Sequence, residues 1–253
     1  MRLIRRITRL LLLAGLLLAG VVMTLLLLPD RKNGIPGKWV KTMRQWWYRN
    51  VLAILGIELD VRGHPVNQPA LWVANHISWL DIPLLGSLAP LGFLSKAEIR
   101  KWPVIGWLAA STGTLFINRG GKNASQAAAR QIAEHIEQGH SILVFPEAMT
   151  TRGVTVKRFH PRLFAAAIDH DLLVQPVAIR YFHSDGTRHE SLPFVDNQSF
   201  FSNLWHVLGE KRALAEVTFF EPVSGGDHAE RRPLADRVHA QVASVFTDAP
   251  AGE

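Results

Sequence analysis

The chain has 253 residues, 48% of them hydrophobic and 19% charged, which is enough for one domain with its own core and excludes wholesale disorder. It contains no Cys, which excludes disulfide scaffolds, thiol nucleophiles and Cys-ligated metal sites. The net charge is +7, but ten Lys or Arg and only one acid lie in the first fifty residues, so the remainder has 18 basic and 20 acidic residues. Such a body lacks the basic face of a nucleic-acid-binding domain, and we expect no nucleic-acid partner.

The first predicted element is an apolar helix at the N-terminus. Leu10–Leu28 has nineteen residues without a charge, follows four Arg and would reach about 28 Å as a helix, the thickness of a bilayer core. A cleaved signal peptide is the alternative, but no small-x-small cleavage site precedes Pro29 and Asp30. We therefore expect a retained membrane anchor. Basic residues flank it on both sides and leave its orientation open.

A second segment with membrane character follows after a turn at Pro36 and Gly37. Trp39–Ile57 mixes Trp and Tyr with Lys and Arg, a composition that suits the lipid headgroup layer. An ordinary amphipathic helix covering the domain core would show the same pattern. Residues 1–57 are thus predicted as a membrane-anchoring helical region, either spanning the bilayer or forming a helical pair in one leaflet.

The rest of the chain alternates short apolar segments with longer helical ones. The predicted strands are Leu71–Asn75, Gly113–Ile117, Ser141–Phe145, Leu172–Ile179 and Glu216–Phe220. The predicted helices are Ile82–Leu88, Ala97–Ala110, Ala124–Gln138, Pro161–Ile168 and Leu234–Phe246. This order predicts an α/β domain over residues 58–247 with a mixed, largely parallel central sheet flanked by helices, and a frayed tail at 248–253.

A polar group of residues follows the first of these strands. If His76 lies in the turn and Asp81 begins the next helix, where Pro83 fits the first turn, Asp81 can accept a hydrogen bond from one imidazole nitrogen. The other nitrogen is then a base with a defined tautomer, able to take a proton from a hydroxyl. The alternative is that Asp81 or Ser78 only caps the helix and His76 is a turn residue.

Two further loops carry candidate binding residues. Gly113 opens a strand that ends before Arg119, whose guanidinium could hold a phosphate or could lie in solvent. After the strand at Ser141–Phe145, one loop contains Glu147, Thr150, Thr151 and Arg152, which are candidate substrate-binding residues. An ordinary strand-to-helix connection is the alternative. The His spacings match no metal-ligand pattern, and we predict neither a metal site nor a bound cofactor.

Taken in order, these patches resemble the glycerolipid (lysophosphatidic acid) acyltransferase family over Leu71 to Ile179. His76 and Asp81 match the family's Asn-His-x4-Asp motif, and Gly113 to Arg119 match a second motif that ends in Arg. Phe145-Pro146-Glu147 match the start of Phe-Pro-Glu-Gly-Thr-Arg-Ser, and Gln175 to Ile179 match a Val-Pro-Val motif. Lys96 falls where the family places a Lys between the first two motifs.

The resemblance implies a reaction. His76 is the expected general base on the hydroxyl of a lyso-lipid, and Asp81 orients it. The acyl donor would be acyl-carrier protein or acyl-coenzyme A, with direct transfer and no acyl-enzyme. Arg119 and Lys96 would hold an anionic headgroup, and Glu147 would order the acceptor loop. A donor made in the cytoplasm implies that the catalytic domain lies on the cytoplasmic face.

One motif departs from the family pattern. After Phe-Pro-Glu the chain has Ala148-Met149-Thr150-Thr151, so Thr150 stands where the family has Arg, and Arg152 lies two residues further on. This form looks like members that acylate lyso-ornithine lipid. Lysophosphatidic acid, giving phosphatidic acid, is the first expectation for the acceptor, because the wider family is larger and Arg119 is present. Lyso-ornithine lipid is the alternative.

The alternative from another functional class is a non-catalytic, membrane-anchored lipid-binding protein on the same fold, although a pure binder has no need of a base.

The apolar stretch Trp102–Ala110 has two interpretations. It could be a lipid-facing ramp or a buried core helix.

Overall fold

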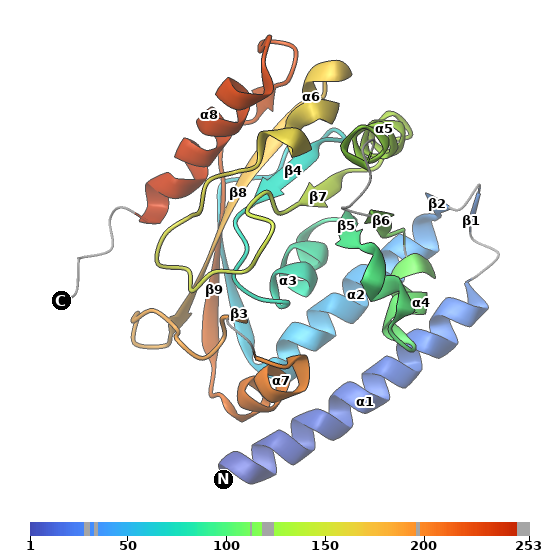
Figure 1. Ribbon diagram of the computed structural model, residues 1–253. Coiled ribbons are helices and arrows are strands. Elements are labelled where there is room, and N and C mark those ends of the chain that lie inside the picture. The colour runs from blue at the N-terminus through green and yellow to red at the C-terminus, as the bar shows by residue number, and fades with distance from the viewer. Residues whose placement is uncertain (28–30, 33–34, 112, 118–123, 196–197, 247–253) are drawn as a thin grey trace.

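The computed structural model describes residues 1–27, 31–32, 35–111, 113–117, 124–195 and 198–246. Its centre is an eight-stranded sheet in the order β3-β9-β8-β4-β7-β5-β6, with β10 paired to β8 (Figure 1). The strands are β3 (Ile57–Arg62), β4 (Leu71–Ala74), β5 (Gly92–Lys96), β6 (Leu115–Ile117), β7 (Ile142–Val144), β8 (Leu173–His183), β9 (Ala213–Phe219) and β10 (Val223–Ser224). A separate two-stranded sheet pairs β1 (Arg31–Lys32) with β2 (Ile35–Pro36).

Helices cover both faces of the central sheet. The helices are α1 (Arg2–Leu26), α2 (Lys38–Leu55), α3 (Asp81–Leu88), α4 (Ile105–Ser111), α5 (Ala124–Glu137), α6 (Ala165–Asp169), α7 (Phe200–Gly209) and α8 (Arg231–Ala243). Short 3-10 helices span Ala97–Lys101, Pro161–Phe164 and Ser244–Phe246. One core cluster lies between the sheet and α1, α2, α3 and α7, and a second lies between the sheet and α5, α6 and α8.

The predicted fold class is confirmed. Within the series β8-β4-β7-β5-β6 each strand runs parallel to the next, and β3 runs parallel to β9. The antiparallel pairs are β8 with β9 and β8 with β10, so the sheet is mixed and mostly parallel. All five predicted strands are present with shifted ends. Strand β3, the short β5 and helix α7 were not predicted, although the apolar residues of β3 alternate and those of α7 recur with a helical period.

One predicted helix is divided. Ala97–Ala110 was predicted as continuous, but the structure has a 3-10 helix at Ala97–Lys101, a turn, and then α4 from Ile105. Pro103 lies at the break, because it lacks an N–H and its ring clashes with the preceding turn of a helix. Trp102, Val104, Ile105 and Trp107 remain 38–45% exposed, so this stretch is not a buried core helix.

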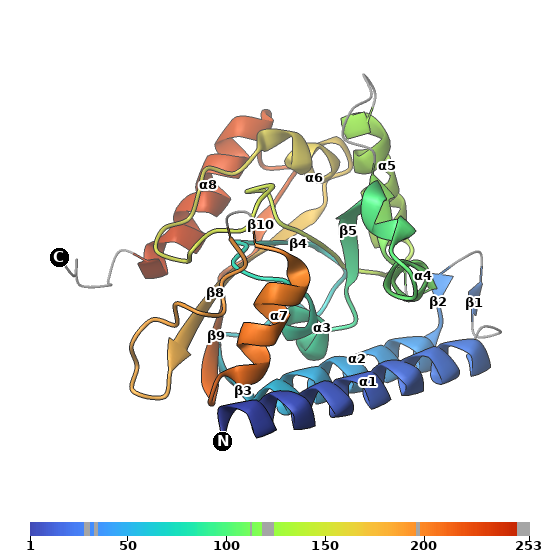
Figure 2. The same ribbon diagram turned by 60° about the horizontal axis from the view of Figure 1, so that its bottom comes forward.

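The two N-terminal helices pack against each other along their lengths (Figure 2). The indole of Trp47 on α2 donates a 2.9 Å hydrogen bond to the carbonyl of Leu16 on α1. The N-terminal end of α1 is held to the end of α7, because Arg9 donates to the carbonyl of Glu210 at 2.7 Å and Arg2 forms a 2.9 Å ion pair with its carboxylate. The α1 helix therefore lies against the domain as one member of a helical pair.

The second helix has a buried apolar face and an exposed aromatic face. Val51, Leu52 and Leu55 of α2 are buried in the first core cluster, as expected of an amphipathic helix that covers the core. Trp39 and Trp46 on the same helix are 66% and 44% exposed. Outside the buried stripe, α2 thus presents the aromatic side chains that suit a lipid headgroup layer.

Candidate active site

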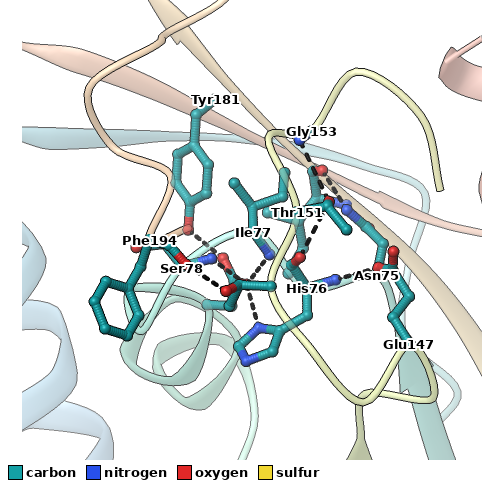
Figure 3. A network of polar contacts seen from close by, with 12 residues as sticks. Asn75, His76, Ile77, Ser78, Glu147, Thr151, Gly153, Tyr181 and Phe194 are labelled. Carbon is teal, nitrogen blue, oxygen red and sulfur yellow. Dashed lines mark hydrogen bonds and ion pairs between the residues drawn. The ribbon is translucent and has the colours of Figure 1, made fainter. Parts of the chain in front are cut away.

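The candidate site lies where the carboxyl ends of β4 and β7 meet, the usual place for function in a parallel sheet. Helix α3 begins at Asp81 with Pro83 in its first turn, which brings the Asp81 side chain back over the preceding turn. Oδ2 of Asp81 accepts hydrogen bonds from the backbone amides of Ile77 at 2.7 Å and Ser78 at 2.9 Å. The same oxygen lies 2.7 Å from Nδ1 of His76. Of the two arrangements that the spacing left open, the structure therefore has the one in which His76 and Asp81 meet. Figure 3 shows the His76 imidazole among the polar contacts of this turn.

Tyr181 completes the environment of this carboxylate. Its hydroxyl donates a 2.8 Å hydrogen bond to Oδ1 of Asp81. Asp81 is fully buried, and four donors surround its two oxygens, which offsets the cost of burying a charge. Burial, and then the charge of Asp81, raise the pKa of Tyr181 well above its ordinary value, so this hydroxyl remains a donor. Both oxygens of Asp81 are thus fixed in place.

The His76 ring is held between Asp81 and Phe145. Phe145, which directly follows β7, stacks on the imidazole with ring centroids 4.0 Å apart and planes 11° apart. With the Nδ1 proton directed to Asp81, Nε2 carries the lone pair, and within the described part of the chain it has no hydrogen-bond partner. The His76 side chain is 19% exposed. The imidazole can therefore meet a substrate hydroxyl in a fixed tautomer and orientation.

Asn75 ties this turn to the neighbouring strand. Its side-chain amide donates to the carbonyl of Ile179 at 3.0 Å and its Oδ1 accepts from the Ile179 amide at 2.7 Å. The side chain thereby continues the β4–β8 ladder past the last backbone pair, Ala74 with Val177. The chain can then leave the sheet at His76 while the strand end stays fixed.

Glu147 connects the His76 turn to the loop after β7. One carboxylate oxygen accepts from the His76 amide at 2.7 Å and the other accepts from the Lys157 amide at 2.8 Å. Burial raises the pKa of Glu147, while these two amide donors act in the opposite direction. Glu147 is 3% exposed, so it contacts the protein backbone rather than solvent.

The remaining candidates of this loop lie beside the same turn. The Thr151 amide donates to the carbonyl of His76 at 2.8 Å. The Thr150 hydroxyl donates to the carbonyl of Phe194, a contact that no sequence pattern indicated. Arg152 is exposed. The Thr151 hydroxyl also donates to the carbonyl of His76, at 3.3 Å. Both threonine side chains are therefore hydrogen-bonded to the main chain.

The structure does not bring Gly113 to this group. Gly113 precedes the amino end of β6, whereas His76 follows the carboxyl end of β4, and the intervening strands are parallel. Lys96 ends β5 at the same edge as His76, but its side chain lies outside the described residues, as does the whole of Arg119. Among the residues that are described, no cluster of three His, Asp or Glu could hold a metal ion.

Tyr181, Phe145 and Phe194 belong to the site but were not identified as functional from the sequence. Tyr181 did carry a signal, since Val177, Ile179 and Tyr181 alternate along β8 and are buried in the same core cluster. A hydroxyl on an inward-facing strand position needs a polar partner, and that partner is Asp81.

Comparisons with known proteins point to one family. A family model described as Acyltransferase matches residues 58–180. A lyso-ornithine lipid O-acyltransferase of Pseudomonas aeruginosa is 42% identical over 225 residues, which cover 87% of this chain and 86% of that protein. A 1-acyl-sn-glycerol-3-phosphate acyltransferase of Neisseria meningitidis is 33% identical over 202 residues, 79% of each chain. The crystal structure of the 1-acyl-sn-glycerophosphate acyltransferase of Thermotoga maritima matches with a TM-score of 0.76 over 100% of this chain and 99% of that one, and at 19% identity this likeness concerns the fold.

Proposed function

This chain belongs to the acyltransferase family, and we propose that it transfers a fatty acyl group from an acyl thioester to the free hydroxyl of lyso-ornithine lipid. The support for acyl transfer is the His76–Asp81 pair, with a 2.7 Å hydrogen bond on one side of the imidazole and a nitrogen available on the other. That arrangement is a base with its orienting carboxylate.

In the proposed mechanism, Nε2 of His76 removes the proton of the acceptor hydroxyl as its oxygen attacks the thioester carbonyl. Asp81 stabilises the imidazolium that forms through its bond to Nδ1. The new ester C–O bond forms, the C–S bond breaks, and the imidazolium returns its proton to the departing thiolate. No acyl-enzyme is required, and the donor is acyl-carrier protein or acyl-coenzyme A.

The residue at position 150 favours lyso-ornithine lipid as the acceptor. A lysophosphatidic acid headgroup is a phosphate with up to two negative charges, for which the Arg of the related Phe-Pro-Glu-Gly-Thr-Arg-Ser motif would be a ligand. Here that position is Thr150, whose hydroxyl is already bonded to the carbonyl of Phe194. The ornithine headgroup has a carboxylate and an ammonium and a net charge near zero, so it has less need of that Arg. The identities of 42% and 33% support the same choice, which reverses the order expected from the sequence.

We propose further that the enzyme is anchored in one leaflet, with its domain on the cytoplasmic face. By length and composition α1 could cross a membrane, with a mean hydropathy of 2.3 in its most apolar window. Its packing along α2 and its Arg contacts with the end of α7 favour a helical pair lying in the surface of the bilayer (Figure 2). A lyso-lipid confined to the same leaflet would then meet His76 at high local concentration.

The test is an acyl-transfer assay on membranes that contain the parent protein or its His76→Ala variant. Lyso-ornithine lipid and lysophosphatidic acid are offered separately with labelled acyl-carrier protein or acyl-coenzyme A. We expect ornithine lipid from the parent protein and a loss of at least about 1,000-fold in the variant, which should still fold and remain on the membrane. Phosphatidic acid as the main product would overturn the acceptor assignment, and retention of lyso-lipid without any product would indicate a lipid-binding protein instead.

A further inference from the structure

A basic segment follows the candidate active site and is the feature from which we draw a further inference. Between Glu147 and Asp169 the chain has no acidic residue, while Arg152, Lys157, Arg158 and Arg162 provide four positive charges. The last three, called here the basic edge, are exposed. Arg158 lies 3.7 Å from the carboxylate of Asp236, the one ion pair that these three residues form within the described part of the chain, and both side chains of the pair are more than half exposed. Such a surface ion pair is weak and can exchange for another acidic partner.

The basic edge and the His76 turn share a hydrogen-bond partner, Glu147. Glu147 holds the His76 amide with one oxygen and the amide of Lys157 with the other. A short path of hydrogen bonds therefore joins the catalytic turn to the residues of the basic edge. A partner that binds there would contact the loop that Glu147 ties to the backbone of the His76 turn.

The basic edge lies on the side of the sheet that carries α8. Phe159 is buried in the second core cluster and contacts His239 of α8 edge-on at 5.1 Å, and the carbonyl of Val156 lies 3.1 Å from Nε2 of the same histidine. The α1–α2 pair packs on the first core cluster, across the sheet. Figure 2 shows α8 and the α1–α2 pair at opposite sides of the fold. The basic edge thus points away from the surface proposed to contact lipid and toward water.

We propose that the basic edge is the docking surface for an acidic acyl-carrier protein, which brings its thioester to His76 from the aqueous side. This inference rests on the proposed acyl transfer and names the partner of that site. The three side chains of the basic edge are separate and exposed. Charges at the rim of an interface attract a partner protein with an acidic surface and orient it as it binds. A small phosphate-bearing donor would instead need donors that converge on one pocket.

The test compares two variants of the full-length protein in membranes. Arg158→Glu/Arg162→Glu reverses two charges of the basic edge. The matched control, Arg130→Glu/Arg212→Glu, reverses two exposed arginines on α5 and before β9, each of which likewise forms a surface ion pair. We expect at least a tenfold rise in KM for acyl-carrier protein in the first variant only, an unchanged kcat, and less than a twofold change in KM for acyl-coenzyme A. Added salt should raise the KM of the parent for the carrier and narrow the difference between the two proteins.

Binding of fluorescently labelled carrier protein, followed by anisotropy, makes this test independent of turnover. If the parent protein transfers no acyl group but binds the carrier through the basic edge, the proposed function fails and the docking surface stands. If both reversals leave carrier binding and KM unchanged, the docking surface is wrong whatever the activity. An equal rise in KM for acyl-coenzyme A, or release of the variant from the membrane, would overturn it as well, since the segment would then bind a small phosphate donor or lipid.

Discussion

The hydroxyl of Tyr181 donates a 2.8 Å hydrogen bond to Oδ1 of Asp81, while Oδ2 of the same carboxylate lies 2.7 Å from Nδ1 of His76. A residue one hundred positions along the chain therefore holds the carboxylate that orients the proposed base. The contact is buried on both sides, so water cannot replace a lost donor easily.

Tyr181→Phe removes this donor and little else. We expect kcat to fall about tenfold and the free energy of unfolding to drop by about 1–3 kcal/mol, the cost of losing a buried hydrogen bond to a charged group. With one donor fewer, Oδ1 of Asp81 is no longer fixed and the imidazole is held less precisely, so the loss should appear in kcat and not in KM. The control is Tyr48→Phe, which changes the other Tyr of the chain, a residue that packs against Phe93. A loss of stability with an unchanged kcat would reduce Tyr181 to a structural role.

Glu147→Gln tests the connection between the His76 turn and the following loop. Two backbone amides point at the carboxylate, and an amide side chain can accept only through its one oxygen, so one amide is left without a partner. We expect kcat to fall about 10- to 100-fold. We also expect faster tryptic cleavage at Arg152, Lys157 and Arg158, located by mass spectrometry. Glu137→Gln on the exposed face of α5 is the control, and equal cleavage rates in both variants would contradict the assigned role.

His189 should make stability depend on pH. Burial, and then the neighbouring His183, lower its pKa to about 4 from an ordinary value near 6.5. Between these values the unfolded chain binds the extra proton, so the contribution of His189 is fully present above about pH 6.5 and is lost as pH falls toward 4, up to about 3 kcal/mol. Unfolding in urea at pH 4.5 and 7 should show a smaller difference for His189→Phe than for the parent protein. The exposed His206→Gln should leave the difference unchanged.

The placement of α1 can be tested with single thiols, because the chain has no Cys of its own. Leu3→Cys and Lys38→Cys put one thiol near the start of α1 and one at the start of α2, both at exposed positions. If the helical pair lies in one leaflet, a membrane-impermeant maleimide should label both thiols from the cytoplasmic side of sealed vesicles. Labelling of the two from opposite sides would show that α1 spans the bilayer.

Features that depend on near neighbours in the chain could be predicted from the amino-acid sequence. Apolar runs separated by helical segments predicted the α/β fold. The five-residue spacing with Pro83 allowed Asp81 to reach His76, and the resemblance to the acyltransferase family selected that arrangement. Covalent geometry and helix initiation limit such contacts to a few arrangements, and a single sequence is sufficient to infer them.

The segments that come together at the site from distant parts of the chain became known from the folded structure. Tyr181 reaches Asp81, Phe145 stacks on His76 and Phe194 accepts from Thr150 because of the strand order β8-β4-β7 and the register of the pairs. Gly113 lies before β6, at the amino ends of the parallel strands, whereas His76 lies at their carboxyl ends. An apolar strand packs equally well beside several others by its own composition, so strand order is settled by the burial of the whole core and cannot be read from one segment at a time.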